Sequence, residues 1–170
     1  MAELTPKERL QPSLLDRLTD DEPGKQQESR DKRVLSPRQL RRSVIRDLEW
    51  LLNSTDLASV QNLSAYPHAI DSVINYGLPE LAGKNVSGLE VGTLERILRR
   101  AIQRFEPRIL RDSLRIRVVV DESLMSHNAI QFDIQGELWG QPMPQQLYLK
   151  TQVDLESGGF EVTERGIPSA

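Results

Sequence analysis

A helix-like pattern runs directly into the triplet Glu106-Pro107-Arg108, the most distinctive group of potentially reactive side chains in the sequence. A carboxyl group there could serve a glycoside hydrolase, which needs two carboxyl groups roughly 5–10 Å apart. Spacing singles out no partner among the nearby acids, which are Glu95, Asp112, Asp121 and Glu122. A general acid must also be protonated, whereas neighbouring arginines favour a charged carboxylate. A lysozyme-like murein hydrolase using Glu106 is therefore an alternative interpretation and not the favoured one.

Other catalytic and metal-binding chemistry has little support. The chain has no cysteine, and its two histidines, His68 and His127, stand at unrelated positions. A zinc site usually takes three or four protein ligands. There is no Gly-x-Ser-x-Gly nucleophile motif and no glycine-rich phosphate loop with its lysine. We therefore expect no catalytic residue, no metal site, no cofactor and no enzyme activity.

Arginines cluster within residues 38–46 and again within 96–117. Such clusters can follow a phosphate backbone, so an arginine-rich nucleic-acid-binding module is a second alternative. The formal net charge is -3 and aromatic residues are few, which argues against binding and stacking on bases. Arginine is also common at protein interfaces, where its planar fork pairs with carboxylates. We expect no nucleic-acid partner.

The same triplet suits a structural joint. Pro107 ends the helix, because the residue before a proline is pushed out of helical geometry. Glu106 could then form charge-assisted hydrogen bonds with Arg104, with Arg108 or with an arginine of another chain. The sequence leaves open whether such a pair lies within the fold or forms an assembly contact.

Two helices precede the triplet or lead into it. Ser36 and Gln39 form a capping box that predicts a helix ending near residues 53–56. Apolar residues at steps of three and four predict a second helix over about 93–105, with Thr93 as its N-cap.

Beyond the triplet the apolar period changes to two, over residues 114–120, 130–138 and 146–154, and a short last strand is possible at 160–162. Helices followed by a strand meander predict an α+β fold. We expect the N-terminal helices to pack on one face of a 3–4-stranded antiparallel sheet formed by the C-terminal third.

The predicted domain organisation has three parts. Residues 1–35 are rich in charge and proline and form a flexible tail, residues 36–163 form a single α+β domain, and residues 164–170 form a C-terminal tail. No apolar run approaches the roughly 20 residues that cross a bilayer, and the first residues lack the apolar core of a secretory signal. We expect a soluble cytoplasmic protein without direct membrane insertion.

One stretch of the tail, PSLLDRL at residues 12–18, departs from its surroundings. Leucines at 10, 14, 15 and 18 fall at helical spacing and would make a short apolar face. This face could fold back on its own domain or dock on another chain, and the pattern does not separate the two.

Four stretches together resemble the TssE family, the small baseplate wedge proteins of type VI secretion systems. That family is related to phage baseplate wedge proteins once labelled lysozyme-like. The stretches are PSLLDRL near the start, LRRSVIRDLEWLLN at 40–53, SVINYGLPELAG at 72–83 and IQRFEPRIL at 102–110. The Phe-Glu-Pro-Arg element is the most specific of them.

The resemblance implies a structural role that links the baseplate wedge to the first ring of the contractile sheath, through strand addition to a sheet edge. Candidate edges are the strands at 114–120 and 146–154. Glu106, Pro107 and Arg108 match the family's Glu-Pro-Arg core and would form the sheath and baseplate interface. A wedge-docking peptide would comprise Pro12, Ser13, Leu14, Leu15, Asp16, Arg17 and Leu18. The implied partners are other wedge proteins, of the TssF, TssG and TssK types, and the sheath subunits, in a cytoplasmic baseplate docked at the inner membrane.

Overall fold

The computed structural model describes residues 13–19, 23–24, 36–81, 91–119, 129–140 and 143–164. Its longer helices are α2 (Pro37–Leu52) and α4 (Val91–Phe105), and its strands are β1 (Arg115–Val119), β2 (Ala129–Leu138), β3 (Gln145–Asp154) and β4 (Phe160–Glu164). The short helical elements are α1 (Leu14–Leu18), η3 (Leu57–Ser59), α3 (Pro67–Ile70), η4 (Val73–Asn75) and η6 (Arg111–Ser113). Helices therefore precede the strands, as the change of apolar period predicts.

The four strands form one antiparallel sheet in the order β1-β2-β3-β4. The prediction that 146–154 is a candidate edge is wrong, because β3 pairs with β2 on one side and with β4 on the other. The outer strands are β1 and β4, so the prediction for 114–120 is confirmed and the short last strand proves to be the second edge. An alternating pattern identifies a half-buried strand but not its place in the sheet.

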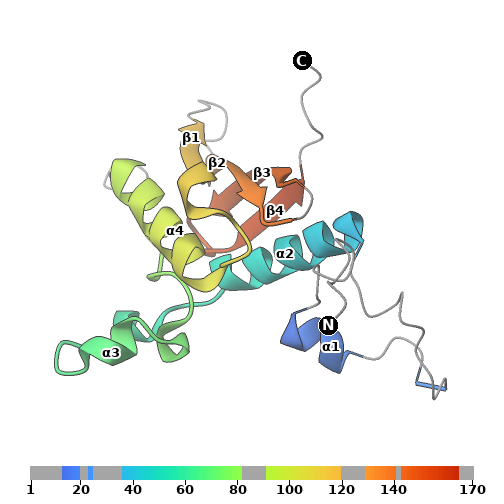
Figure 1. Ribbon diagram of the computed structural model, residues 1–170. Helices are drawn as coiled ribbons and strands as arrows, with labels where there is room; N and C mark the ends of the chain where they lie inside the picture. The colour runs from blue at the N-terminus through green and yellow to red at the C-terminus, as the bar shows by residue number, and fades with distance from the viewer. Residues whose placement is uncertain are drawn as a thin grey trace.

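Helices α2 and α4 cover one face of this sheet, with α4 beside β1 and α2 beside β4 (Figure 1). Apolar side chains of both helices meet those of the strands in a single core, in which Val44, Ile102 and Phe132 are fully buried. On the opposite face the strands carry polar residues such as Arg117, Gln135 and Lys150. This one-sided burial is the α+β architecture expected from the sequence.

Helix α2 begins as predicted, whereas helix α4 begins earlier than predicted. Ser36 and Gln39 form the capping box at the start of α2, with both reciprocal hydrogen bonds present. Helix α4 starts at Val91, so Thr93 lies within its first turn and is not the N-cap. Helix boundaries inferred from sequence commonly shift by a few residues, because the apolar period is weakest at the ends.

Residues 57–76 form an arm of short helical turns that projects from the helical layer (Figure 1). Its return to the domain passes through Gly77, whose φ is +127°. A Cβ atom at this position would lie 2.4 Å from the backbone oxygen of Ser54, so only glycine fits. Leu78 then donates to the same oxygen at 2.8 Å, which ties the arm to the end of α2.

No helix within the described parts of the chain is both long and apolar enough to cross a membrane.

Candidate functional site

The Glu-Pro-Arg triplet joins the end of α4 to the end of strand β2. The Glu106 amide continues the helix by donating to the Ile102 carbonyl at 2.9 Å. Two to four residues later the chain pairs with the end of β2: Trp139, just after that strand, donates to the Arg108 carbonyl at 2.7 Å, and Leu110 donates to the Glu137 carbonyl at 2.8 Å. The triplet therefore turns the backbone from helical into sheet hydrogen bonding within a few residues.

Glu106 and Arg108 pair with each other inside the chain. Arg108 Nε donates to Glu106 Oε1 at 2.7 Å and Arg108 Nη2 donates to Oε2 at 2.5 Å, which is a bidentate arrangement. The Arg108 backbone amide adds a third bond to Oε1 at 3.1 Å. Glu106 is only 3% exposed, whereas Pro107 between them is exposed to solvent. The sequence left open whether Glu106 pairs within the chain or with another chain. The structure shows the pair within the chain.

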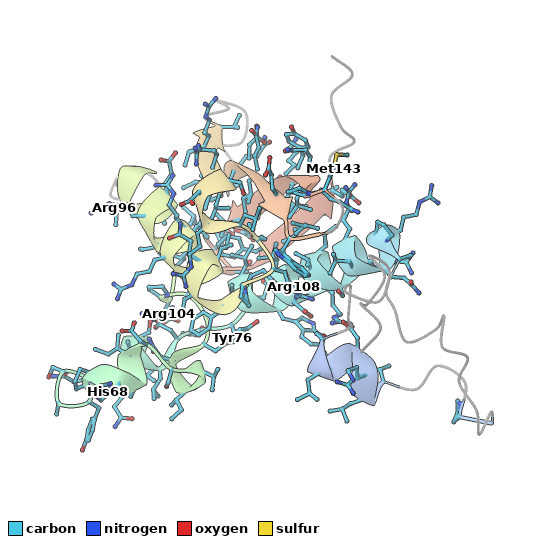
Figure 2. The ribbon with its side chains drawn as sticks, in the orientation of Figure 1. His68, Tyr76, Arg96, Arg104, Arg108 and Met143 are labelled. Atoms are coloured by element: carbon cyan, nitrogen blue, oxygen red, sulfur yellow. The ribbon has the colours of Figure 1, made fainter. Side chains whose placement is uncertain are left out.

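The pair extends onto helix α2, where Arg108 meets residues that lie some sixty positions earlier. Its Nη2 donates to Asp47 Oδ2 at 2.5 Å and its Nη1 to the Ser43 hydroxyl at 3.2 Å. Arg108 is labelled in Figure 2 beside this helix. Each terminal nitrogen of its guanidinium therefore has a partner, and the side chain clamps α2 to the joint.

Asp47 continues the network towards the N-terminal segment. Arg46 Nε and Nη2 donate to Asp47 Oδ1 at 2.9 and 2.7 Å, and Arg46 Nη1 lies 2.8 Å from Asp16 Oδ1 in helix α1. We call this series the ion-pair chain; its members are Glu106, Arg108, Asp47, Arg46 and Asp16. It connects the Glu-Pro-Arg triplet directly to the predicted docking peptide.

Helix α1 contacts the domain through Asp16, and two of its three leucines are largely exposed. Leu14 and Leu18 are 72% and 74% exposed, and Leu15 is 40% exposed. Ser13 caps the helix in a capping box with Asp16, whose carboxylate also holds Arg46. Pro12 and Leu10 lie outside the described residues. Leu14 and Leu18 are thus left largely open to solvent.

Charges and burial act together on the titratable groups of this network. Burial lowers the pKa of Arg108, but its hydrogen bonds to Glu106 and Asp47 and their charges outweigh burial and raise that pKa overall. Burial raises the pKa of Asp16, but hydrogen bonds from Ser13 and Arg46 reverse the shift, so its pKa lies below the usual value. Burial, followed by the charges of Asp47 and Glu106, raises the pKa of Tyr76. The network therefore favours the charged forms of its acid and base.

A second group of contacts fixes the arm to the end of α4. Arg104 pairs with Asp71 and donates to the Ile70 carbonyl at 2.6 Å, and Tyr76 packs edge-on against Phe105 with ring centroids 5.2 Å apart. Figure 2 shows Arg104 and Tyr76 between the arm and the domain, with His68 far out along the arm. Tyr76 also donates to the Asp47 carbonyl at 3.3 Å. The arm and the triplet thus share α2 as a common support.

Sequence reasoning identified the two ends of the ion-pair chain and missed its middle. Asp47 and Arg46 stand next to each other on α2 without any distinguishing local pattern, and Ser43 was not singled out either. Their roles depend on residues far away in the sequence. Only a tertiary contact between α2 and the triplet makes them part of the site.

The arrangement leaves little room for a hydrolase centred on Glu106. Both carboxylate oxygens are engaged by Arg108 and the side chain is buried, so a substrate could not reach it. Glu95 binds the backbone of β1, and Asp112 is exposed on η6. Asp121, Glu122 and His127 lie outside the described residues. Within the described residues no group of three or more histidine or acidic side chains could hold a metal ion.

Several arginines of the two sequence clusters are engaged by carboxylates of the same chain. Arg41 pairs with Glu164, and Arg46, Arg104 and Arg108 pair as described above. These side chains are consequently committed to structure and not to a phosphate-binding surface.

The chain matches the family of baseplate wedge protein gp25 over residues 38–143, which is more than half of its length. This range contains all of α2 but its first residue, the arm, α4, the Glu-Pro-Arg triplet and the first two strands. No curated protein and no solved structure gives a significant match. The family is one of structural baseplate components, which agrees with a joint built from ion pairs. This protein therefore belongs to the gp25 family of baseplate wedge proteins.

Proposed function

We propose that this protein links the baseplate wedge of a type VI secretion system to the first ring of its contractile sheath. The observation that carries the proposal is the joint at Glu106-Pro107-Arg108, which fastens α4, α2 and the end of strand β2 to one another. A component that transmits force between two assemblies must hold its elements in fixed relation, and the bidentate pair does this within a short segment. The exposed Pro107 places the outer surface of the joint within reach of a partner.

In this proposal the sheet accepts an extended segment of a sheath subunit at one of its edges. An edge strand offers unpaired backbone groups, and an added strand satisfies them while its alternate side chains select the partner. The described strands form an open sheet, with β1 and β4 as outer strands, so such a position exists.

The N-terminal segment would dock on another wedge component, of the TssF, TssG or TssK type. Its support is the exposure of Leu14 and Leu18 on a helix whose Asp16 pairs with Arg46 of the domain. In this organisation residues 1–35 are a tail that carries the peptide at 12–18, residues 36–163 are the joining domain, and 164–170 form a second tail. The protein acts without catalysis, in the cytoplasm, at a baseplate docked on the inner membrane.

Affinity capture of the tagged protein from its own cells, followed by mass spectrometry, tests this function. We expect wedge and sheath proteins with the unaltered chain, and loss of the sheath with Glu106→Ala. Because that variant also weakens the fold, Pro107→Arg is the sharper change: it adds a bulky charge to the surface of the joint and leaves the ion pair in place. Glu49→Ala, an exposed acid on α2, is the matched control.

Two outcomes would contradict the proposal. Capture of the unaltered chain without wedge or sheath proteins would remove its basis. Sheaths of normal number and length in cells carrying Pro107→Arg and Glu106→Ala would show that the triplet is not an interface. Murein digestion that disappears with Glu106→Gln would instead favour a hydrolase.

A further inference from the structure

A cavity of about 210 Å³, which we call the arm cavity, lies between the arm and helix α4. Its apolar lining consists of Ile70, Leu78, Pro79, Ile97, Ala101 and Phe105. An apolar cavity of about 150 Å³ is already large enough to hold a benzene ring, whereas sites for small-molecule ligands usually begin at about 300 Å³. The arm cavity therefore has the size for one bulky apolar side chain of another protein.

Contacts within the chain fix both walls of the arm cavity. The arm returns to the domain at Gly77, whose φ is +127°. Arg104 of α4 pairs with Asp71 and donates to the Ile70 carbonyl at 2.6 Å. Asn75, which is buried, donates to the same carbonyl at 3.1 Å. A partner would consequently not have to order the arm when it binds, which lowers the entropic cost of association.

Arg100 stands at the rim of the arm cavity with its charge only partly neutralised. It lines the cavity together with Arg104, which Figure 2 shows where the arm meets the domain. Both arginines reach Asp71, but Arg104 makes the close contact. The Arg100 side chain is 71% exposed and lies 3.8 Å from that carboxylate. An exposed pair of this kind is weak, so Arg100 remains able to pair with a carboxylate of a partner.

Arg96 and Arg99 extend the positive charge away from Arg100 along α4. Residues four apart are neighbours on the surface of a helix, so Arg96 lies next to Arg100. The hydrogen bonds of Arg96 go to neutral oxygen atoms in the first turn of α4. Asp56 in the lining and Asp71 beside it balance only part of this charge. A partner at this rim should therefore carry carboxylates, because complementary charge steers association and selects the partner.

We propose that the arm cavity is a docking site for an acidic segment of a partner protein, which inserts one bulky apolar side chain and pairs its carboxylates with Arg100 and Arg96. The apolar lining supplies most of the affinity, because burying one such side chain strengthens binding by about tenfold or more. The arginines supply selectivity, since an exposed ion pair contributes at most about fivefold. The site uses neither the Glu-Pro-Arg triplet, nor helix α1, nor a strand edge, so it goes beyond the proposed function and does not depend on it.

The test uses the full chain with labelled isoleucine methyl groups and three short synthetic peptides. The first peptide has a central phenylalanine flanked by glutamates, the second replaces the phenylalanine with alanine, and the third replaces the glutamates with lysines. NMR shifts of Ile70 and Ile97 report on the arm cavity, and Ile74, which is exposed on the same arm outside the lining, is the internal control.

We expect the first peptide to shift the methyl resonances of Ile70 and Ile97 and not those of Ile74. The second peptide should bind about tenfold more weakly, because it lacks the side chain that fills the cavity. The third should bind about fivefold more weakly, because its lysines meet arginines at the rim.

A variant that fills the arm cavity tests its role directly. Ala58 is exposed and lines the cavity, so Ala58→Phe places a ring there without altering the buried core. Binding of the first peptide should fall by at least about tenfold. Ala65→Phe, at an exposed alanine of the arm outside the lining, is the matched control and should bind as the unaltered chain does. The dispersion of the methyl spectrum shows whether each variant folds.

Reversing the charge at the rim gives a second variant that leaves the apolar lining intact. Arg100→Glu should make the lysine peptide bind more tightly than the glutamate peptide, because it inverts the charge that selects the partner. Arg42→Glu, at an exposed arginine of α2, should leave the preference unchanged. This variant decides the question if Ala58→Phe does not fold.

Four outcomes would overturn the proposal. Shifts at Ile74 in place of Ile70 and Ile97 would put binding outside the arm cavity. Equal binding of the three peptides, or unchanged binding by a folded Ala58→Phe, would show that neither the cavity nor its rim selects a partner. Shifts at Ile70 and Ile97 that grow with protein concentration without peptide would identify a second copy of the chain as the occupant. The same shifts with vesicles of anionic phospholipid, and none with peptide, would identify a lipid surface.

Discussion

The two ends of the ion-pair chain are built from the same kinds of side chain but stand in different surroundings. At the inner end Glu106 is 3% exposed and receives both nitrogens of the Arg108 fork. At the outer end the side chains of Arg46 and Asp16 are 33% and 13% exposed, and a single nitrogen makes the contact. A similar pairing therefore holds the triplet at one end and helix α1 at the other, with the outer pair more exposed to water.

The reason for the difference is the cost of leaving a charge alone. A buried charge that loses its partner cannot be solvated fully, whereas an exposed charge exchanges its partner for water and ions. Breaking the inner pair should consequently destabilise the fold more than breaking the outer pair. Asp47 belongs to both ends, since it binds Arg108 through one oxygen and Arg46 through the other.

The largest effect on stability is expected from a substitution at the inner end of the ion-pair chain. Glu106→Ala leaves the half-buried Arg108 without its main partner and should lower the free energy of unfolding by about 3–5 kcal/mol. Urea denaturation followed by circular dichroism measures this change, with the exposed Glu49→Ala as a control. A decrease in the free energy of unfolding of less than about 1 kcal/mol would show that the inner pair contributes no more to stability than an ion pair at the surface.

An intermediate effect is expected at Asp47. Asp47→Asn retains the shape of the side chain but removes the charge that both arginines share. We therefore expect it to lower the free energy of unfolding by about 1–2 kcal/mol. A double-mutant cycle of Asp47→Asn with Arg46→Ala should show coupling of at least about 0.5 kcal/mol. Strict additivity would mean that the two ends are independent and that no continuous chain of interactions joins them.

A small effect on stability, with a clear effect on the N-terminal segment, is expected at the outer end. Arg46→Ala should lower the free energy of unfolding by at most about 1 kcal/mol, because the pair between Arg46 and Asp16 is partly solvated. Helix α1 should nevertheless lose its attachment, which appears as reduced heteronuclear NOE values for residues 14–18. Arg42→Ala, an exposed arginine of the same helix, should leave those values unchanged. Unchanged values in Arg46→Ala would show that other contacts hold α1.

The smallest effect is expected from acidification. The pKa of Asp16 is lowered in the folded protein, so its contribution to docking is present above the usual value and is lost as pH falls through the folded pKa. A titration from about pH 6 to pH 3 should therefore release α1 at the acid end, as followed by the NOE of Leu18. The Arg46→Ala variant should lack this step. A release near neutral pH would point to another group.

The local elements of this protein are determined by the sequence alone. The capping box at Ser36 and Gln39, the apolar stripes of the two long helices and the alternation of the strands all act between residues a few positions apart. The stop at Pro107 is equally local, since proline restricts its own backbone and that of Glu106. For this reason the helix-then-strand order and the α+β fold were predictable.

Only the tertiary structure decided which partners these elements meet. The clamp of Arg108 on Asp47 and Ser43, and the attachment of Asp16 to Arg46, join residues that no short-range pattern relates. The same holds for the sheet, in which alternation predicts a strand but pairing on both sides makes β3 central. Such pairings depend on how the whole core closes, because buried polar groups take whichever partners that closure brings within hydrogen-bonding distance.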